Sequence, residues 1–419
     1  MLHVDFKKIL AGAITKEREF LPIHLPRELK ELYLTMTMLN FALASGMLFE
    51  PIYLYTLRFS LSEIMLYYFA VYALYFFLMP LGGRFVKRYG FEHGIIFGSL
   101  FLVAYFLFLL AIPFSPFFTV CAVVSLAMQK TFFWPGYHAD FAFFSKAEER
   151  GREVSIIALL DSFSYIAGPL VGGVLISLFG FAGLFAVMCA MILLSNIPLM
   201  TTKERFKPST LSYSEPYAAL IAKENRRYLF AYIGFGEELV SLAVWPIFIY
   251  VTFTTFANTG AAITFSTLIT SLAILYVGRQ TDRADRKKIL RISTLLLSLS
   301  WVLRVFVRGA SAVIFADFFS RTSRYLFAMP LFSGLYKHAT QTSIVRTVIF
   351  FEMALTVGKM IAAALLAVIF YYVPEYSAWN IAFAVAAMFS LLYFFLSRNH
   401  QIDTPRRPSE DDIYPPCKL

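Results

Sequence analysis

Long apolar runs separated by short polar segments fill most of the chain, from about residue 32 to residue 397. Each run holds about 20 residues, the length that a helix needs to cross the hydrocarbon core of a bilayer. The runs are continuous and lack the alternation of a membrane β-strand. The sequence therefore predicts an all-α polytopic membrane protein with twelve transmembrane helices. The expected spans are residues 32–55, 63–82, 94–112, 117–136, 154–178, 181–200, 228–251, 257–277, 290–307, 311–334, 344–372 and 378–397.

The chain has the pattern of a duplication, because a polar stretch at 201–227 divides the spans into two sets of six. A Gly followed by basic residues stands between two spans at Gly83 in the first set and at Gly278 in the second. We therefore expect two pseudo-symmetric six-helix bundles. The expected parts are a cytoplasmic N-terminal segment 1–31, an N-terminal bundle 32–200, a cytoplasmic linker 201–227, a C-terminal bundle 228–397 and a cytoplasmic tail 398–419.

Positive charge is distributed unevenly over the expected loops. Most of the 37 Lys and Arg residues lie in the two terminal segments and the even-numbered loops, whereas the odd-numbered loops hold Arg58 and Arg308. Cytoplasmic loops are the ones enriched in Lys and Arg. Both termini should therefore face the cytoplasm, at the plasma (inner) membrane. The net charge of +10 then reflects topology, and we expect no nucleic-acid partner.

Composition also limits the function classes. Hydrophobic residues make up 59% of the 419 residues and charged residues 15%, which is typical of a chain solvated by lipid. Cys121, Cys189 and Cys417 indicate neither a disulfide framework nor a metal cluster. His138 and the other histidines fall in expected loops or terminal segments, without the spacing of metal ligands. The sequence has no phosphate-binding Gly-Lys-Ser/Thr loop and no catalytic cluster, so we expect neither an enzyme nor a cofactor.

Two charged turns resemble a signature loop of the major facilitator superfamily, which runs Gly-x-x-x-Asp-Arg-x-Gly-Arg-Lys/Arg. The matching positions after the span 257–277 are Gly278, Asp282, Arg283, Arg286 and Lys287. The loop after the span 63–82 keeps Gly83, Arg88 and Gly90, with Lys87 at the position of the Asp. By this resemblance, Asp282 and Arg283 would form a latch that closes the cytoplasmic side. The alternative is that these charges only anchor a solvated turn.

The span 154–178 carries a further resemblance to the same family. Gly168, Pro169, Gly172 and Gly173 match its Gly-x-x-x-Gly-Pro-x-x-Gly-Gly pattern, which in the family is associated with antiporters. Small residues also let helices pack closely, so plain packing is the alternative interpretation. The resemblance covers residues 32 to 397 and implies alternating access of two bundles around one site near the membrane midplane.

Polar and charged side chains inside the spans are the candidate functional residues, because a charge in a bilayer costs several kcal/mol unless it is paired or hydrated. They concentrate in the spans that line the central cavity in the family. Arg321 and Arg324 suit an anionic substrate, or they neutralise Asp317 and nearby acids. The substrate-cavity candidates are Asn40, Gln129, Lys130, Trp134, Trp245, Asp317, Arg321 and Arg324.

Carboxylates inside the spans are the candidates for proton coupling, since an acid in a low-dielectric cavity can bind and release a proton near neutral pH. Glu237 and Glu238 are consecutive, so one should face the cavity and the other a neighbouring helix. The alternative is static pairing, such as Glu238 with Arg321 and Glu352 with Lys359. The proton-coupling candidates are Glu237, Glu238, Asp161 and Glu352.

These features predict a secondary active transporter of small molecules, a monomer in the lipid bilayer, that uses proton-coupled antiport for efflux. The alternative within the same class is a proton-coupled symporter that imports a sugar, an organic anion or another nutrient. A polytopic membrane enzyme or a scaffold is the alternative from a different class. An enzyme should show a catalytic cluster at a loop or span end, and a scaffold should not need so many charges inside the membrane.

Overall fold

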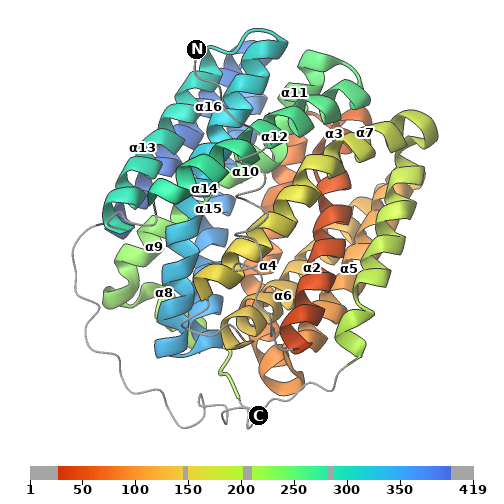
Figure 1. Cartoon of the computed structure of the whole chain (residues 1–419). Helices are drawn as coiled ribbons and strands as arrows, with labels where there is room; N and C mark the ends of the chain where they lie inside the picture. The colour runs from red at the N-terminus through yellow and green to blue at the C-terminus, as the bar shows by residue number, and fades with distance from the viewer. Residues whose placement is uncertain (1–26, 145–149, 202–209, 282–285, 398–419) are drawn as a thin grey trace, which may run out of the picture.

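The computed structural model describes residues 27–144, 150–201, 210–281 and 286–397, and its long elements there are all helices (Figure 1). The helices are α2 (Arg27–Gly46), α3 (Glu50–Thr56), α4 (Leu61–Tyr89), α5 (Phe91–Ala111), α6 (Phe117–Phe144), α7 (Arg150–Ser195), α8 (Glu215–Ile221), α9 (Arg226–Ile233), α10 (Gly236–Leu239), α11 (Trp245–Phe253), α12 (Phe256–Thr281), α13 (Arg286–Val305), α14 (Ala310–Gln341), α15 (Ile344–Tyr372) and α16 (Glu375–Leu391). A π-helical turn, Val240–Val244, joins α10 to α11.

Within the described residues, nine segments are long and apolar enough to cross a membrane. One of them, Ser162–Met200, is about twice the needed length, and α7 breaks inside it at Gly180. The φ of Gly180 is 67°, a left-handed value that glycine adopts freely. This break separates the spans expected at 154–178 and 181–200. The helices α13 and α14 have 20 and 32 residues but are too polar to count among the nine. The all-α membrane fold is therefore confirmed, and the number of twelve spans stays a prediction.

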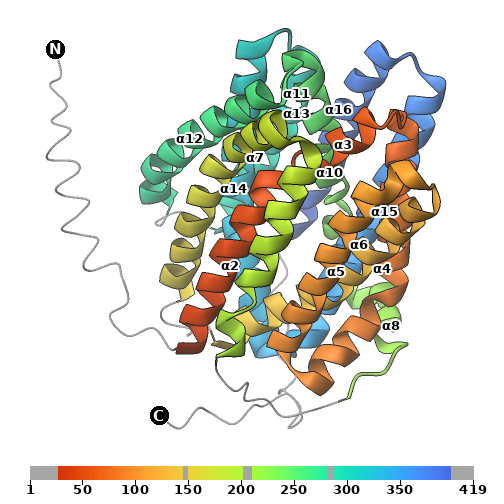
Figure 2. The ribbon, with the colours of Figure 1, turned by 90° about the vertical axis from the view of Figure 1, so that its right-hand side faces the viewer.

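Two long helix pairs hold the molecule together. The helix α4 packs along α15, and α7 packs along α12 (Figure 2). In Figure 1, α2, α5 and α6 lie on the right and α13, α15 and α16 on the left, so each pair joins an early helix to a late one. The boundaries of the two expected bundles stay predictions, and the tail at 398–419 lies outside the described residues.

The small residues of α7 face its neighbours closely. Gly168 and Gly172 lie against α2, and Gly173 lies against α12. A Cβ on Gly172 would stand 1.8 Å from the carbonyl oxygen of Ser45, which leaves no room for a side chain. Pro169 stands inside α7 without ending it. The motif of the span 154–178 therefore has a packing role at two helix contacts.

The expected linker is partly structured, since α8 and the residues before it lie against α4 and α15. The hydroxyls of Tyr213 and Tyr217 donate to the carbonyl oxygen of Phe77, at 2.7 and 3.1 Å. Glu215 forms an ion pair with Arg346 of α15, with 2.8 Å between Oε1 and Nε. This segment links the C-terminal half of α4 to the start of α15.

We predict that Gly172→Val destabilises the protein by about 3 kcal/mol or more, because the new side chain must push α7 away from α2. Thermal unfolding of the detergent-purified protein measures the change. The matched control is Val174→Leu on the lipid-facing side of the same helix, where 40% of the side chain is exposed. Equal unfolding midpoints for the two variants would contradict the packing role.

Candidate functional site

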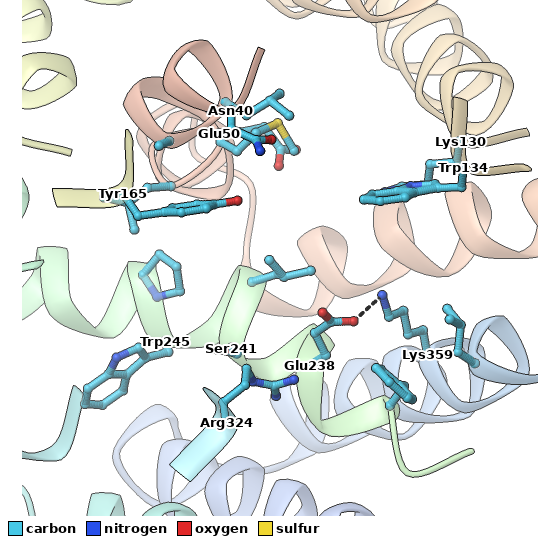
Figure 3. Close-up of a pocket in the computed structure, with 18 of the residues that line it drawn as sticks. Asn40, Glu50, Lys130, Trp134, Tyr165, Glu238, Ser241, Trp245, Arg324 and Lys359 are labelled. Atoms are coloured by element: carbon cyan, nitrogen blue, oxygen red, sulfur yellow. Dashed lines mark ion pairs between the residues drawn. The ribbon is translucent and has the colours of Figure 1, made fainter. Parts of the chain in front are cut away.

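A cavity of about 450 Å³ lies at the centre of the molecule, within the size range of small-molecule sites. Side chains from α2, α3, α4 and α6 line one side, and side chains from α10 to α15 line the other, with α7 between them. Figure 3 shows the labelled residues converging on this space from different helices. Helices from the early and the late parts of the chain thus enclose the cavity together.

Most of the residues proposed from sequence lie in its wall, two do not, and the side chain of one more lies outside the described residues. The cavity candidates in the wall are Asn40, Lys130, Trp134, Trp245, Asp317, Arg321 and Arg324, joined by Glu238 and Glu352 among the acids. Gln129 and Glu237 are buried but do not line the cavity. Asp161 belongs to α7, and its side chain lies outside the described residues.

The two consecutive glutamates point to different surroundings. Glu237 is fully buried, accepts hydrogen bonds from Trp301 Nε1 at 3.0 Å and Tyr393 OH at 3.1 Å, and pairs with Arg324. Glu238 faces the cavity and pairs with Lys359 of α15, with 2.6 Å between Oε2 and Nζ (Figure 3). The π-helical turn that begins two residues later changes which side chains of this segment face inward.

Asp317 is the centre of a second buried cluster. Arg321 lies one turn away, with Nε 2.6 Å from a carboxylate oxygen of Asp317. Arg304 lies 3.9 Å from the other oxygen, and its guanidinium sits over the rings of Trp245 and Trp301 at 4.1 and 3.9 Å. Cation–π contact compensates a desolvated guanidinium. Arg321 therefore neutralises Asp317, as one of the two sequence interpretations held.

Glu352 joins helices from the two ends of the chain. The carboxylate of Glu352 in α15 accepts a hydrogen bond from Tyr75 of α4 at 2.9 Å. His138 Nε2 of α6 lies 3.2 Å from the other oxygen, and His138 Nδ1 lies 2.8 Å from the hydroxyl of Tyr336 in α14. Glu352 and His138 are 4% and 5% exposed. This cluster connects α4 and α6 to α14 and α15 through side chains that can gain or lose protons.

Three sequence expectations are corrected here. His138 is not in a loop, because α6 continues through Pro135 to Phe144, past the expected end at residue 136. A proline inside a membrane helix is tolerated where neighbouring helices accommodate it. The static pairs are also different: Glu238 pairs with Lys359, not with Arg321, and Glu352 contacts His138, not Lys359. Side-chain partners on separate helices depend on rotation and depth, which a linear sequence does not contain.

Sequence reasoning missed Glu50 as a site residue. Glu50 of α3 is 2% exposed, lines the cavity and accepts hydrogen bonds from Tyr68 at 2.6 Å and from Tyr105. Tyr67 donates in turn to Tyr105 at 3.2 Å. The described residues offer Glu50 no ion pair with a cation. The signal in the sequence is a row of tyrosines at helical spacing in the span 63–82, which faces the cavity through Tyr68, Tyr72 and Tyr75.

The charged turns are described only in part. Gly83 faces Ile349 of α15 so closely that a Cβ would stand 2.0 Å from its methyl group. Arg88 lies over the ring of Tyr89, and Gly90 ends α4 with φ 113°. In the second turn, Lys287 is exposed, whereas Asp282 and Arg283 lie outside the described residues. Gly278 and Arg286 are described in their backbone alone. The latch stays a prediction.

Comparisons with known proteins show which proteins this chain is similar to. A family profile described as Major Facilitator Superfamily matches residues 32–236. The match covers just under half of the chain, and together with the shared fold it supports a transporter of the major facilitator type. These findings support a multi-pass membrane protein that carries out secondary transport and is a transporter rather than an enzyme. No curated protein matches the sequence.

Solved structures share the superfamily fold at low sequence identity. The nucleoside transporter NupG is 14% identical with a TM-score of 0.66, covering 88% of this chain and 98% of that one. A structure titled for proton dependent oligopeptide transporters is 12% identical with a TM-score of 0.66, covering 88% and 97%. A bacterial homologue of the human drug peptide transporters PepT1 and PepT2 is 13% identical with a TM-score of 0.65, covering 88% and 97%. At these identities the likeness shows the fold alone.

We predict that Glu237→Ala destabilises the protein by about 3–5 kcal/mol, because it leaves the partly buried Arg324 without its carboxylate. Thermal and denaturant unfolding in detergent measure the loss. Glu224→Ala, at an exposed acid, is the control and should change stability by less than about 0.5 kcal/mol. If Glu237→Ala unfolds like the control, Glu237 does not hold this cluster together.

Proposed function

We propose that the chain carries a small molecule across the membrane in exchange for, or together with, protons, and that Glu352 and His138 bind the coupled proton. The observation that carries the proposal is the contact of these two buried side chains between α15 and α6, beside the cavity. Neither side chain contacts a permanently charged guanidinium or ammonium in the described residues. A proton can therefore be gained or lost here without breaking an Arg or Lys pair.

The other acids are less suited to exchange a proton. Asp317 and Glu237 pair with arginines, whose charge is permanent and favours the ionised carboxylate. Glu238 pairs with Lys359 at 2.6 Å, which holds its charge in the same way. Among the described residues, Glu50 accepts hydrogen bonds from tyrosine hydroxyls alone, and it is the next candidate. Asp161 stays a candidate from the sequence.

The position of Glu352 between α6 and α15 links protonation to a change in the contact of these helices. With one shared proton, Glu352 and His138 form either a neutral pair or an ion pair, and both can stay buried. Without the proton, the carboxylate is an uncompensated charge in a water-poor seam, at a cost of several kcal/mol. Loss of the proton thus favours a state in which water reaches the seam between α6 and α15. Such a shift between two populated states is what alternating access requires.

Two modes of coupling follow from two different features. The small-residue motif of α7 favours antiport and efflux, because the pattern is associated with antiporters in the superfamily. The charge of the cavity wall favours symport. Its cationic side chains are Lys130, Arg304, Arg321, Arg324 and Lys359, and its acids are Glu50, Glu238, Asp317 and Glu352. Glu237 behind the wall balances the excess, so a proton on Glu352 leaves one positive charge that an anion would neutralise. A proton and an anion would then favour each other's binding.

The orientation and setting belong to the same proposal. Both termini face the cytoplasm by the excess of Lys and Arg in the terminal segments and even-numbered loops. The protein works as a monomer in the plasma (inner) membrane. The C-terminal end of α4 and the start of α15 would then be cytoplasmic.

We predict that Glu352→Gln abolishes accumulation driven by a pH gradient, with at least a tenfold loss, while exchange of labelled for unlabelled substrate continues. Gln keeps the shape and the hydrogen bond from Tyr75 but cannot bind a proton. Proteoliposomes loaded with a pH-sensitive dye and labelled substrate measure both. Glu375→Gln, at an exposed acid, is the control. Full gradient-driven accumulation by Glu352→Gln would remove Glu352 from the proton site.

The direction of coupling is read from the sign of the gradient in the same vesicles. An antiporter accumulates the substrate when the vesicle interior is acidic, because outward proton flow drives inward substrate flow. A symporter accumulates it when the interior is alkaline. Transport that ignores the gradient in both arrangements would overturn proton coupling as a whole.

A further inference from the structure

We infer that the transported molecule carries an anionic group, a carboxylate or a phosphate, and that Lys130 of α6 binds this group. The inference rests on the proposed function in one respect, that the central cavity is where the transported molecule binds. It does not depend on the coupling ion or on the direction of transport. It also differs from the sequence interpretation in which Arg321 and Arg324 hold the anion.

The cavity cations are not equivalent. Arg304 and Arg321 lie beside Asp317, Arg324 pairs with Glu237, and Lys359 pairs with Glu238. Lys130 is the remaining one. Within the described part of the chain, no carboxylate lies within ion-pair distance of its ammonium.

The surroundings of Lys130 are ready for a counter-charge. Its Nζ stands 5.6 Å from the centre of the Tyr72 ring, and Nζ of Lys359 stands 5.3 Å from the same centre. Lys130 is partly buried and lines the cavity, so its ammonium is partly desolvated without an ionic partner. Lys130 attracts the carboxylates of Glu50 and Glu238 over a longer distance, without forming an ion pair with either. An ionised ligand oxygen would supply the short charge-assisted hydrogen bond that the protein itself does not.

The side chains of the cavity wall indicate the shape and polarity of the rest of the ligand. Trp134 lies one helical turn further along α6, and Figure 3 shows its ring beside Lys130 at the edge of the cavity. Phe133, Phe332 and Phe351 add apolar surface elsewhere in the cavity wall. Flat aromatic walls favour a flat, apolar body. The geometry thus points to a small organic anion whose charged end meets Lys130 and whose body lies against the aromatic side chains.

The test is binding to the full-length protein in detergent or nanodiscs at one fixed pH, measured as a rise of the thermal unfolding midpoint. The probes are matched in shape: benzoate, indole-3-acetate and phenyl phosphate as anions, benzamide and indole-3-acetamide as neutral amides, and benzylamine and tryptamine as cations. We expect one or more anions to raise the midpoint, and their matched amides and amines to leave it unchanged. The carboxylate and phosphate probes separate the two possible anionic groups.

Substitutions of Lys130 then test whether its positive charge binds the anion. Lys130→Gln should weaken binding of the active anion about tenfold to a hundredfold, since it removes one charge-assisted contact. Lys130→Arg keeps a positive charge and should restore most of the affinity. Lys288→Gln, at an exposed lysine, should bind like the unchanged protein. Rescue by Arg separates a charge effect from a folding defect, and unfolding without ligand checks that all three variants fold.

Several results would overturn the inference. They are a preference for the amides or amines, a panel in which no anion raises the midpoint, and anion binding that Lys130→Gln leaves intact. None of these results bears on proton coupling, because no gradient is present. Conversely, loss of coupling in the proteoliposome experiment with Glu352→Gln leaves the anion inference standing.

Discussion

Charges buried among membrane helices must find partners on other helices, and this requirement organises the centre of the molecule. An unpaired ion in such surroundings costs several kcal/mol, so each carboxylate selects a donor that another helix brings within reach. Asp317 contacts side chains of α12 and α13 as well as of its own helix α14. Glu237 of α10 contacts side chains of α13 and α14. The paired charges fix how these helices are rotated and how deep they sit. The cavity is the space that remains between them.

The same pairing separates the buried acids into those with a permanently charged partner and those without one. Carboxylates held by arginine have a permanent counter-charge beside them and link the helices that carry the pair. Glu352 differs, because its partners His138 and Tyr75 are uncharged or only conditionally charged. A fixed network surrounding one exchangeable group suits a carrier, since the helices stay defined while one contact changes with protonation. Lys130 is the complementary case, a cation that the protein leaves for a ligand.

Close backbone contacts give the helices a rigid frame around this exchange. Gly172 brings α7 against α2, and Gly83 brings α4 against α15. The contact at Gly172 is with backbone and leaves no room for a side chain, whereas a Cβ at Gly83 would meet the terminal methyl of Ile349. The π-helical turn at Val240–Val244 adds a local irregularity directly after the two glutamates. It redirects the segment so that Glu238 and Trp245 both reach the cavity, while Glu237 is turned into the packed helices.

The sequence by itself determined the class of fold, because continuous apolar runs of about 20 residues have one stable form in a bilayer. It also located the break near Gly180 and most of the polar positions in the cavity wall, since charge inside a span is costly enough to mark a site. Only the tertiary structure decided the partners. Glu238 meets Lys359 and Glu352 meets His138 because of helix rotation and depth, which depend on packing between segments far apart in the chain. For the same reason His138 and Glu50 entered the site only when α6 and α3 were seen in place.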